Sequence, residues 1–186
     1  MKLFIKNMVC SRCIMTVEQI LKEHGIKTEK VNLGEAELAE PLSDTERDQI
    51  NQSLQKVGFE LLDDLKKQQI EKIKSLIIQK VQSGEIEEHF ILSNFLAASM
   101  FKDYSYLSKL FSEQQGITIE QFFIQQKIEK VKEWLIYDEF ALNEISWKLG
   151  YSSVQHLSAQ FKRVTGMTPS TFKKTGNVHR KTLDNI

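Results

Sequence analysis

The helical architecture of the chain is clearest in Asn143-Glu144-Ile145-Ser146-Trp147-Lys148-Leu149-Gly150-Tyr151-Ser152-Ser153, which runs on into Phe161-Lys162-Arg163-Val164-Thr165-Gly166-Met167-Thr168-Pro169. The pattern predicts a short helix, a turn at Gly150, a second helix, and a stop formed by Gly166 and Pro169. This spacing is typical of a helix-turn-helix, in which one helix supports a second whose outer face enters a DNA major groove. The stretch therefore indicates DNA binding.

The distribution of charge supports that interpretation, although the net charge of the 186 residues is zero. Residues 1–63 contain 8 Lys and Arg against 11 Asp and Glu, whereas residues 147–186 contain 7 basic residues and one acid, Asp184. A local excess of positive charge is what contacts with phosphates require. We therefore expect double-stranded DNA to be the partner of the basic end.

Composition indicates a soluble globular protein with one or two domains, since 41% of the residues are hydrophobic. The first residues, Met1 to Lys6, lack the apolar run of a signal peptide, and no stretch approaches the roughly 18 apolar residues that cross a membrane. We expect a cytoplasmic protein without membrane contact. The only cysteines, Cys10 and Cys13, are too few for a disulfide scaffold, so we expect free or metal-bound thiols.

The first third of the chain alternates between strand and helix patterns. We expect a strand at residues 2–6, a helix at 11–24, a hairpin at 31–38, a helix capped by Ser43, and a last strand at 59–62. The order βαββαβ is the ferredoxin-like pattern. The charged run from Asp63 to Gln69 has no apolar period, so a domain boundary is expected there.

Beyond that run only helices are predicted. Ser93 and Asp103 are candidate caps of two short helices, and the capping-box pattern from Thr118 to Gln121 opens a long connecting helix at about 118–138. The predicted fold is α+β in two domains. They are a ferredoxin-like domain at 1–64 and an all-α domain with two helix-turn-helix units at 65–186.

The paired helices resemble the DNA-binding module of AraC-family transcription regulators. The resemblance covers roughly residues 70–174 and rests on Leu96-Ala97, Tyr106 to Phe111, Ile128 to Lys132, and Ile145 to Pro169. Membership of this family implies two recognition helices in successive major grooves, beginning here near Tyr104 and Ser153. Such modules usually act as dimers, so a homodimer is an open alternative.

Leu107, Leu110, Leu157 and Phe161 are expected to face the core, which leaves an outward set on each recognition helix. Gln and Arg suit the edges of adenine and guanine, while Lys suits phosphates. The predicted DNA contacts are Tyr104, Ser105, Ser108, Lys109, Ser153, Gln155, His156, Gln160, Lys162, Arg163, Lys173 and Lys174. Two residues depart from the family pattern: Ser146 replaces a small apolar residue, and Lys127 replaces an arginine.

A second motif, Met8-Val9-Cys10-Ser11-Arg12-Cys13, stands between the first strand and the first helix. With the βαββαβ order it resembles the heavy-metal-associated domain of copper chaperones and metal-transporting ATPases. The resemblance implies that Cys10 and Cys13 bind a soft ion, with Cu(I) favoured because zinc would need two more ligands. We also expect Arg12 to lower the pKa of both thiols, and Asn7 departs from a glycine in that family.

Three functions follow from these patterns. The first is a sequence-specific regulator, not an enzyme, that responds to a soft metal ion at Cys10 and Cys13. The second is a thiol redox-sensing regulator or a thiol-based enzyme. In the third, the amino-terminal domain only dimerises or docks a partner, using its edge strand.

Overall fold

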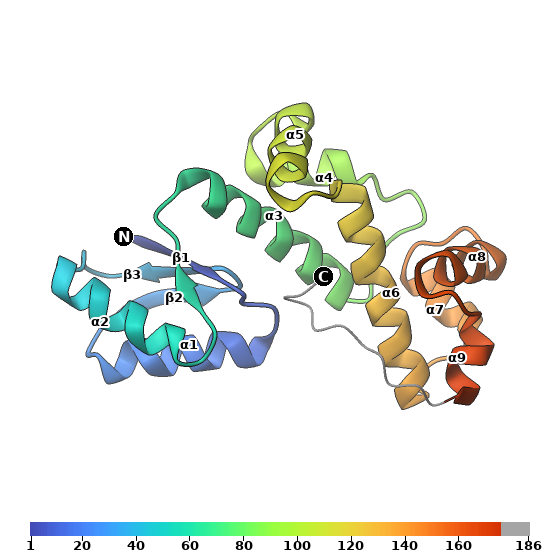
Figure 1. Ribbon diagram of the computed structural model, residues 1–186, viewed down its shortest axis with the longest axis horizontal. Helices are drawn as coiled ribbons and strands as arrows, with labels where there is room; N and C mark the ends of the chain where they lie inside the picture. The colour runs from blue at the N-terminus through green and yellow to red at the C-terminus, as the bar shows by residue number, and fades with distance from the viewer. Residues whose placement is uncertain (176–186) are drawn as a thin grey trace. The chain divides into compact units, whose positions relative to one another are not determined.

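The computed structural model describes residues 1–175, and they divide into two compact units. One unit spans Met1–Ser75 and the other begins at Leu76. Within the described residues, no helix has the length and apolar character that crossing a membrane requires. Figure 1 shows a sheet with helices in the first unit and helices throughout the second.

The first unit has the element order that the sequence predicts. Its elements are β1 (Lys2–Lys6), α1 (Ser11–Glu23), β2 (Thr28–Asn32), β3 (Glu35–Leu38), α2 (Asp44–Gln55) and β4 (Glu60–Leu61). The strands form one sheet in the order β2-β3-β1-β4, and each neighbouring pair is antiparallel. Because β3 lies between β1 and β2, α1 must cross over a strand to connect them.

Alternation of side chains sets the core of this unit. Leu3 and Ile5 of β1 are buried while their neighbours Lys2 and Lys6 are at least partly accessible, as the period of two requires. The helices α1 and α2 pack against each other and bury apolar stripes (Figure 1). The stripes consist of Val17, Ile20, Leu21, Ile50 and Leu54.

The charged run that was expected to mark a boundary instead opens a helix, α3 (Leu65–Gln82). Asp64 explains the start, since its carboxylate accepts hydrogen bonds from the backbone N–H groups of Lys66 and Lys67 at 2.8 and 3.0 Å. The predicted boundary at 64 coincides with this start, whereas the compact units divide within α3, after Ser75.

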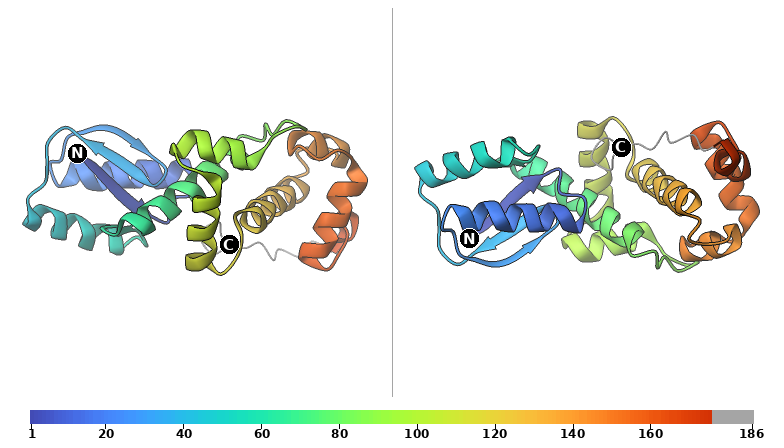
Figure 2. Two further views of the ribbon diagram at one scale, coloured as in Figure 1. Left: turned by 90° about the horizontal axis from the view of Figure 1, so that it is seen from above. Right: turned by 90° about the horizontal axis from the view of Figure 1, so that it is seen from below.

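The second unit adds six helices to the end of α3 among the described residues. They are α4 (Leu92–Met100), α5 (Tyr104–Gln115), α6 (Ile119–Tyr137), α7 (Leu142–Lys148), α8 (Val154–Thr165) and α9 (Pro169–Thr175). In Figures 1 and 2, α6 runs between the pair α4 and α5 and the group α7, α8 and α9. This arrangement separates two short helix pairs by one long helix.

Local capping patterns were the most reliable guide to these helices. The predicted box at α6 is present, because the Thr118 hydroxyl accepts from the N–H of Gln121 and the Gln121 side chain accepts from the N–H of Thr118. The prediction that Ser93 caps α4 is wrong: α4 starts at Leu92, and its cap position is Ile91, two residues before Ser93. Asp103 does occupy the cap position of α5, without a side-chain hydrogen bond to the helix.

Candidate nucleic-acid interface and thiol pair

The two helix-turn-helix units repeat each other at a shift of 50 residues. The helices α4, α5 and α6 begin at positions 92, 104 and 119, and α7, α8 and α9 begin at 142, 154 and 169. Both α5 and α8 contain 12 residues and end on a left-handed glycine, Gly116 or Gly166. The sequence already indicated similar helix pairs, and the structure extends the repeat into a third helix.

Equivalent aromatic pairs hold each unit together. The rings of Phe111 and Phe122 lie 5.6 Å apart between centroids, and those of Phe161 and Phe172 lie 5.5 Å apart. The four residues expected in the core, Leu107, Leu110, Leu157 and Phe161, are buried. Burial of side chains of this size stabilises a fold by roughly 1.5–3 kcal/mol each. Each recognition helix is therefore fixed on its inner face, which leaves its outer face to contact a partner.

The outer face of α8 is a polar and basic stripe. The exposed residues of α8 are Gln155, His156, Ala159, Lys162, Arg163 and the apolar Val164, and all but Val164 make up this stripe. Ser153 caps this helix, since its hydroxyl accepts from the N–H of His156 at 3.1 Å. Ser152 Oγ lies 3.2 Å from His156 Nδ1, which holds the imidazole at the start of the helix. Among the described residues, neither Lys162 nor Arg163 forms an ion pair, so both are available to phosphates or bases.

The prediction that Gln160 faces outward is wrong. Its side chain is 8% exposed, and Oε1 accepts a hydrogen bond of 2.7 Å from the Tyr151 hydroxyl. The repeat could have revealed this, because the equivalent residue in the first unit is the core residue Leu110. A buried amide requires a partner, and Tyr151 supplies it from across the turn.

The outer face of α5 carries less free charge. Ser105, Tyr106 and Lys109 are exposed, and Ser108 is half-buried. Lys109 Nζ lies 4.0 Å from a carboxylate oxygen of Glu113, one turn further along. The predicted contact residue Tyr104 is half-buried, and its hydroxyl donates to the Glu120 carboxylate of α6. Burial and this hydrogen bond raise the pKa of Tyr104 above its usual range. The Tyr104 hydroxyl thus links α5 to α6 by a hydrogen bond.

Several other lysines lie at exposed positions of the two helix-turn-helix units. Lys173 of α9 pairs with Asp138 at the end of α6, while Lys174 is exposed. Sequence reasoning missed two exposed lysines that precede recognition helices, Lys102 and Lys148. Their spacing gave no signal, because both stand in or next to turns where no helical period applies.

The family departure at Lys127 has a structural role. Its Nζ donates to the carbonyl of Leu149 at 2.8 Å and lies 3.7 Å from the centroid of the Tyr151 ring. Burial lowers the pKa of Lys127 to about 8. The other departure, Ser146, is fully buried and satisfies its hydroxyl by donating to the carbonyl of Asn143 at 2.7 Å. Both polar residues are therefore accommodated in the second unit.

The thiols of Cys10 and Cys13 face each other at the start of α1. Their Sγ atoms are 3.4 Å apart, and both side chains are partly accessible. Met8 is buried, and His24 lies at the far end of α1. The described residues contain no group of three or more His, Cys, Asp or Glu able to hold a metal ion. The thiol groups at this place are therefore the two of Cys10 and Cys13.

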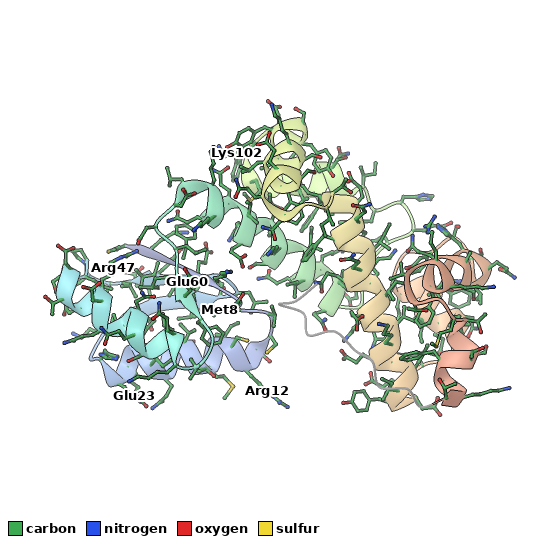
Figure 3. The ribbon with its side chains drawn as sticks, in the orientation of Figure 1. Met8, Arg12, Glu23, Arg47, Glu60 and Lys102 are labelled. Atoms are coloured by element: carbon green, nitrogen blue, oxygen red, sulfur yellow. The ribbon has the colours of Figure 1, made fainter. Side chains whose placement is uncertain are left out.

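The lowered pKa expected for Cys13 beside Arg12 is not found. Arg12 is exposed and projects outward from α1 (Figure 3), and the pKa of Cys13 is raised, chiefly because burial disfavours the thiolate. Asn7, in contrast, replaces glycine well. It adopts the left-handed conformation with φ 69°, which asparagine tolerates, and its side-chain amide donates to the carbonyl of Gly58 at 3.0 Å.

Comparison with known proteins identifies the helical repeat. Residues 96–175 match a family model described as a helix-turn-helix domain. The xylose operon regulatory protein of Escherichia coli is 36% identical over 69 residues, which are 37% of this chain and 18% of that protein. The transcriptional activator RhaR of Salmonella dublin is 30% identical over 95 residues, 51% of this chain and 33% of that protein.

These relatives are transcription regulators by name, and the chain matches a third or less of their length. Among solved structures, the carboxyl-terminal domain of the response regulator AraT from Geobacillus stearothermophilus shares the fold. Its TM-score is 0.50 at 21% identity, covering 57% of this chain and 84% of that one. Residues 96–175 therefore form a helix-turn-helix domain.

Proposed function

We propose that this protein is a sequence-specific transcription regulator whose helices α5 and α8 enter two successive major grooves of one DNA duplex. The observation that carries the proposal is the repeat of 50 residues, which gives two complete helix-turn-helix units on one long helix. Each unit buries one face of its second helix and exposes the other, as reading of a groove requires.

The exposed stripe of α8 supplies both kinds of contact that recognition needs. Gln155 can pair bidentately with an adenine and Arg163 with a guanine, whereas Lys162 and Lys174 need only reach a phosphate. On α5, Ser105 holds the place of Gln155 and Lys109 the place of Ala159, and Ser108 lies at the edge of the stripe. Ser153 and Tyr104 support the fold of the two helices and are available to the DNA only at their accessible edges.

A binding-site selection tests this function directly. The full chain is incubated with random duplexes at fixed salt, and Arg163→Ala and Lys162→Ala are compared on the selected site. Arg163→Ala should cost about 1–3 kcal/mol and relax the preference at one base pair. Lys162→Ala should weaken all sequences alike and reduce the salt slope by about 1. Failure of the wild type to enrich any sequence would refute the proposal.

For the amino-terminal compact unit, Met1–Ser75, we infer a ferredoxin-like domain that senses a soft metal ion through Cys10 and Cys13. The βαββαβ order and the sheet order support the domain class, and the pair of thiols 3.4 Å apart supports the donor set. Two sulfurs suit a soft ion such as Cu(I), and they fall short of the four ligands of structural zinc. Bound there, the ion would supply a positive charge and a crosslink between the loop and α1.

Binding requires both thiols to lose their protons. Because burial raises the pKa of Cys13, the apparent affinity should increase with pH. The test is a Cu(I) titration against a competing chelator, with the wild type and the variant Cys10→Ser, Cys13→Ser, together with DNA affinity at each metal level. Equal stoichiometry in the two proteins, or a DNA affinity that ignores the metal, would contradict metal sensing.

The same geometry favours a second candidate, a thiol redox sensor. Thiols at 3.4 Å need only a small approach to form a disulfide once an oxidant removes two electrons and two protons. Thiol counting after mild peroxide treatment, followed by measurement of DNA affinity, separates the two candidates. A disulfide that changes DNA affinity favours redox sensing, and an effect of Cu(I) without oxidation favours metal sensing.

A further inference from the structure

Phe101 combines two unusual properties in one residue. Its side chain is 93% exposed, the highest value among the large hydrophobic residues of the described chain. Its backbone is left-handed, with φ 52° and ψ 43°, at the end of α4. A bulky side chain at positive φ is a conformational outlier and is strained. Strain and exposure together are a combination that selection for stability alone would remove.

The second helix-turn-helix unit shows that a turn between these helices requires neither a strained aromatic residue nor an exposed one. Its left-handed residue is Gly150, and the equivalent of Phe101 is Tyr151, which is 2% exposed. Tyr151 turns inward, where its hydroxyl bonds Gln160 and its ring lies below Lys127. An aromatic side chain at this place can therefore be buried. In the first unit it stands in solvent immediately before the recognition helix.

The surroundings of Phe101 are basic and aromatic. The next residue, Lys102, is exposed near one end of α5 (Figure 3), and its Nζ lies 5.3 Å from the centroid of the Tyr106 ring. Tyr106 is 45% exposed on the outer face of α5. In a helix-turn-helix, the amino-terminal end of the second helix is the part that contacts base edges. Phe101 therefore lies beside the end of α5 that would meet the bases.

We propose that Phe101 is a specificity-determining contact that packs against the C5 methyl group of a thymine at the edge of the half-site bound by α5. The thymine methyl is the one apolar group that the major groove displays, and an exposed phenyl ring is complementary to it. Lys102 supplies a cation for the adjacent phosphate. This inference rests on the proposed DNA binding by α5 and adds the identity of one base.

The test uses the full chain and the duplex obtained by selection with the wild type. Thymines of the α5 half-site are replaced one at a time by deoxyuridine, which lacks only the C5 methyl. Affinity is measured for the wild type, Phe101→Asn and Phe101→Leu. Asparagine tolerates the left-handed backbone, so Phe101→Asn removes the ring without adding strain, and Phe101→Leu keeps an apolar contact. Met15→Ala, an exposed apolar residue of α1, is the control.

At one thymine, deoxyuridine should weaken the wild type about four-fold, the equivalent of one methyl group. Phe101→Asn should be insensitive to that replacement, Phe101→Leu should retain part of the sensitivity, and Met15→Ala should behave as the wild type. If Phe101→Asn keeps the same sensitivity at every thymine, the inference fails while the proposed function stands. If the wild type selects no sequence at all, both fail.

Discussion

The two helix-turn-helix units share a frame and differ in what they present. The helix starts, the glycine caps of α5 and α8 and the phenylalanine pairs correspond at a shift of 50 residues. On the outer faces, however, Lys162 and Arg163 of α8 stand where α5 has Ser112 and Glu113. The pairing of Lys109 with Glu113 reduces the free charge of α5 further. The two units thus repeat one frame, while α8 has the more basic outer face.

The turns differ as well. In the second helix-turn-helix unit, the loop between α3 and α4 lies against the turn. There the N–H of Ile86 donates to the carbonyl of Lys148 at 2.9 Å. Gly150 permits this approach. In the first unit Phe101 takes the left-handed position and points into solvent. The second turn is therefore fixed by packing, whereas the first turn exposes an aromatic side chain.

The largest effect is expected from Gly150→Ala. A Cβ there would lie 2.8 Å from the carbonyl oxygen of Glu87, with φ at +64°. Strain and collision with the backbone should lower the free energy of unfolding by about 3 kcal/mol. The matched control is Gly116→Ala, also at positive φ but with nothing within 4 Å, which should cost about 1 kcal/mol. Urea denaturation measures both, and equal losses would contradict the distinction between the turns.

Removal of the α8 charges should have the next largest effect. Lys162→Ala combined with Arg163→Ala should reduce DNA affinity about 10- to 100-fold at physiological salt and lower the salt slope by about 2. Lys109→Ala should change the slope by less, since Glu113 already offsets that charge. Fluorescence anisotropy at salt concentrations from about 50 to 200 mM measures the DNA affinity and the salt slope of each variant. Similar slopes for the two variants would show that α5 and α8 contribute equally.

Lys127 should make the free energy of unfolding of the helical compact unit, which begins at Leu76, depend on pH. Its pKa is lowered to about 8 in the folded protein, compared with the ordinary value of 10.5. Between these values the unfolded chain binds more protons, so stability rises with pH. Between about pH 7 and 9.5 the gain should be about 1–2 kcal/mol, because the cation–π contact with Tyr151 opposes part of the effect of burial.

Lys127→Arg is the control for that titration, because arginine keeps its charge throughout this range. Urea denaturation at several pH values should give a flatter profile for the variant. The titration stops below the pH range in which tyrosine ordinarily ionises. Burial raises the pKa of Tyr151, so the unfolded chain would lose that proton first and the free energy of unfolding would fall. Parallel profiles for both proteins would remove Lys127 as the cause.

The smallest effect is expected from Glu113→Ala. Loss of the carboxylate frees Lys109 and removes a negative charge from the face of α5, so DNA affinity should increase a few-fold. Glu139→Ala, which removes an exposed carboxylate beyond the end of α6, controls for net charge. An equal increase in both variants would mean that the position of Glu113 is irrelevant.

Patterns that depend on neighbours in sequence were predictable. The capping box at Thr118, the glycine caps and the inward stripe of Leu107 and Leu157 follow from helical geometry alone. Predictions failed where the partner comes from another element. Gln160 is buried because Tyr151 reaches it across a turn, and the Tyr104 hydroxyl is engaged by Glu120 of α6. Burial by tertiary packing also explains why the pKa of Cys13 is raised instead of lowered.

Binding-site selection with the full chain, followed by selection with Lys162→Ala, Arg163→Ala, tests the central claim most directly. The account predicts two sequence blocks whose centres are about 10 base pairs apart, one helical turn of DNA. The block lost in the variant should be the one read by α8, and the block read by α5 should persist. A single block, or the uniform weakening of both, would contradict the assignment of two grooves to two unequal units.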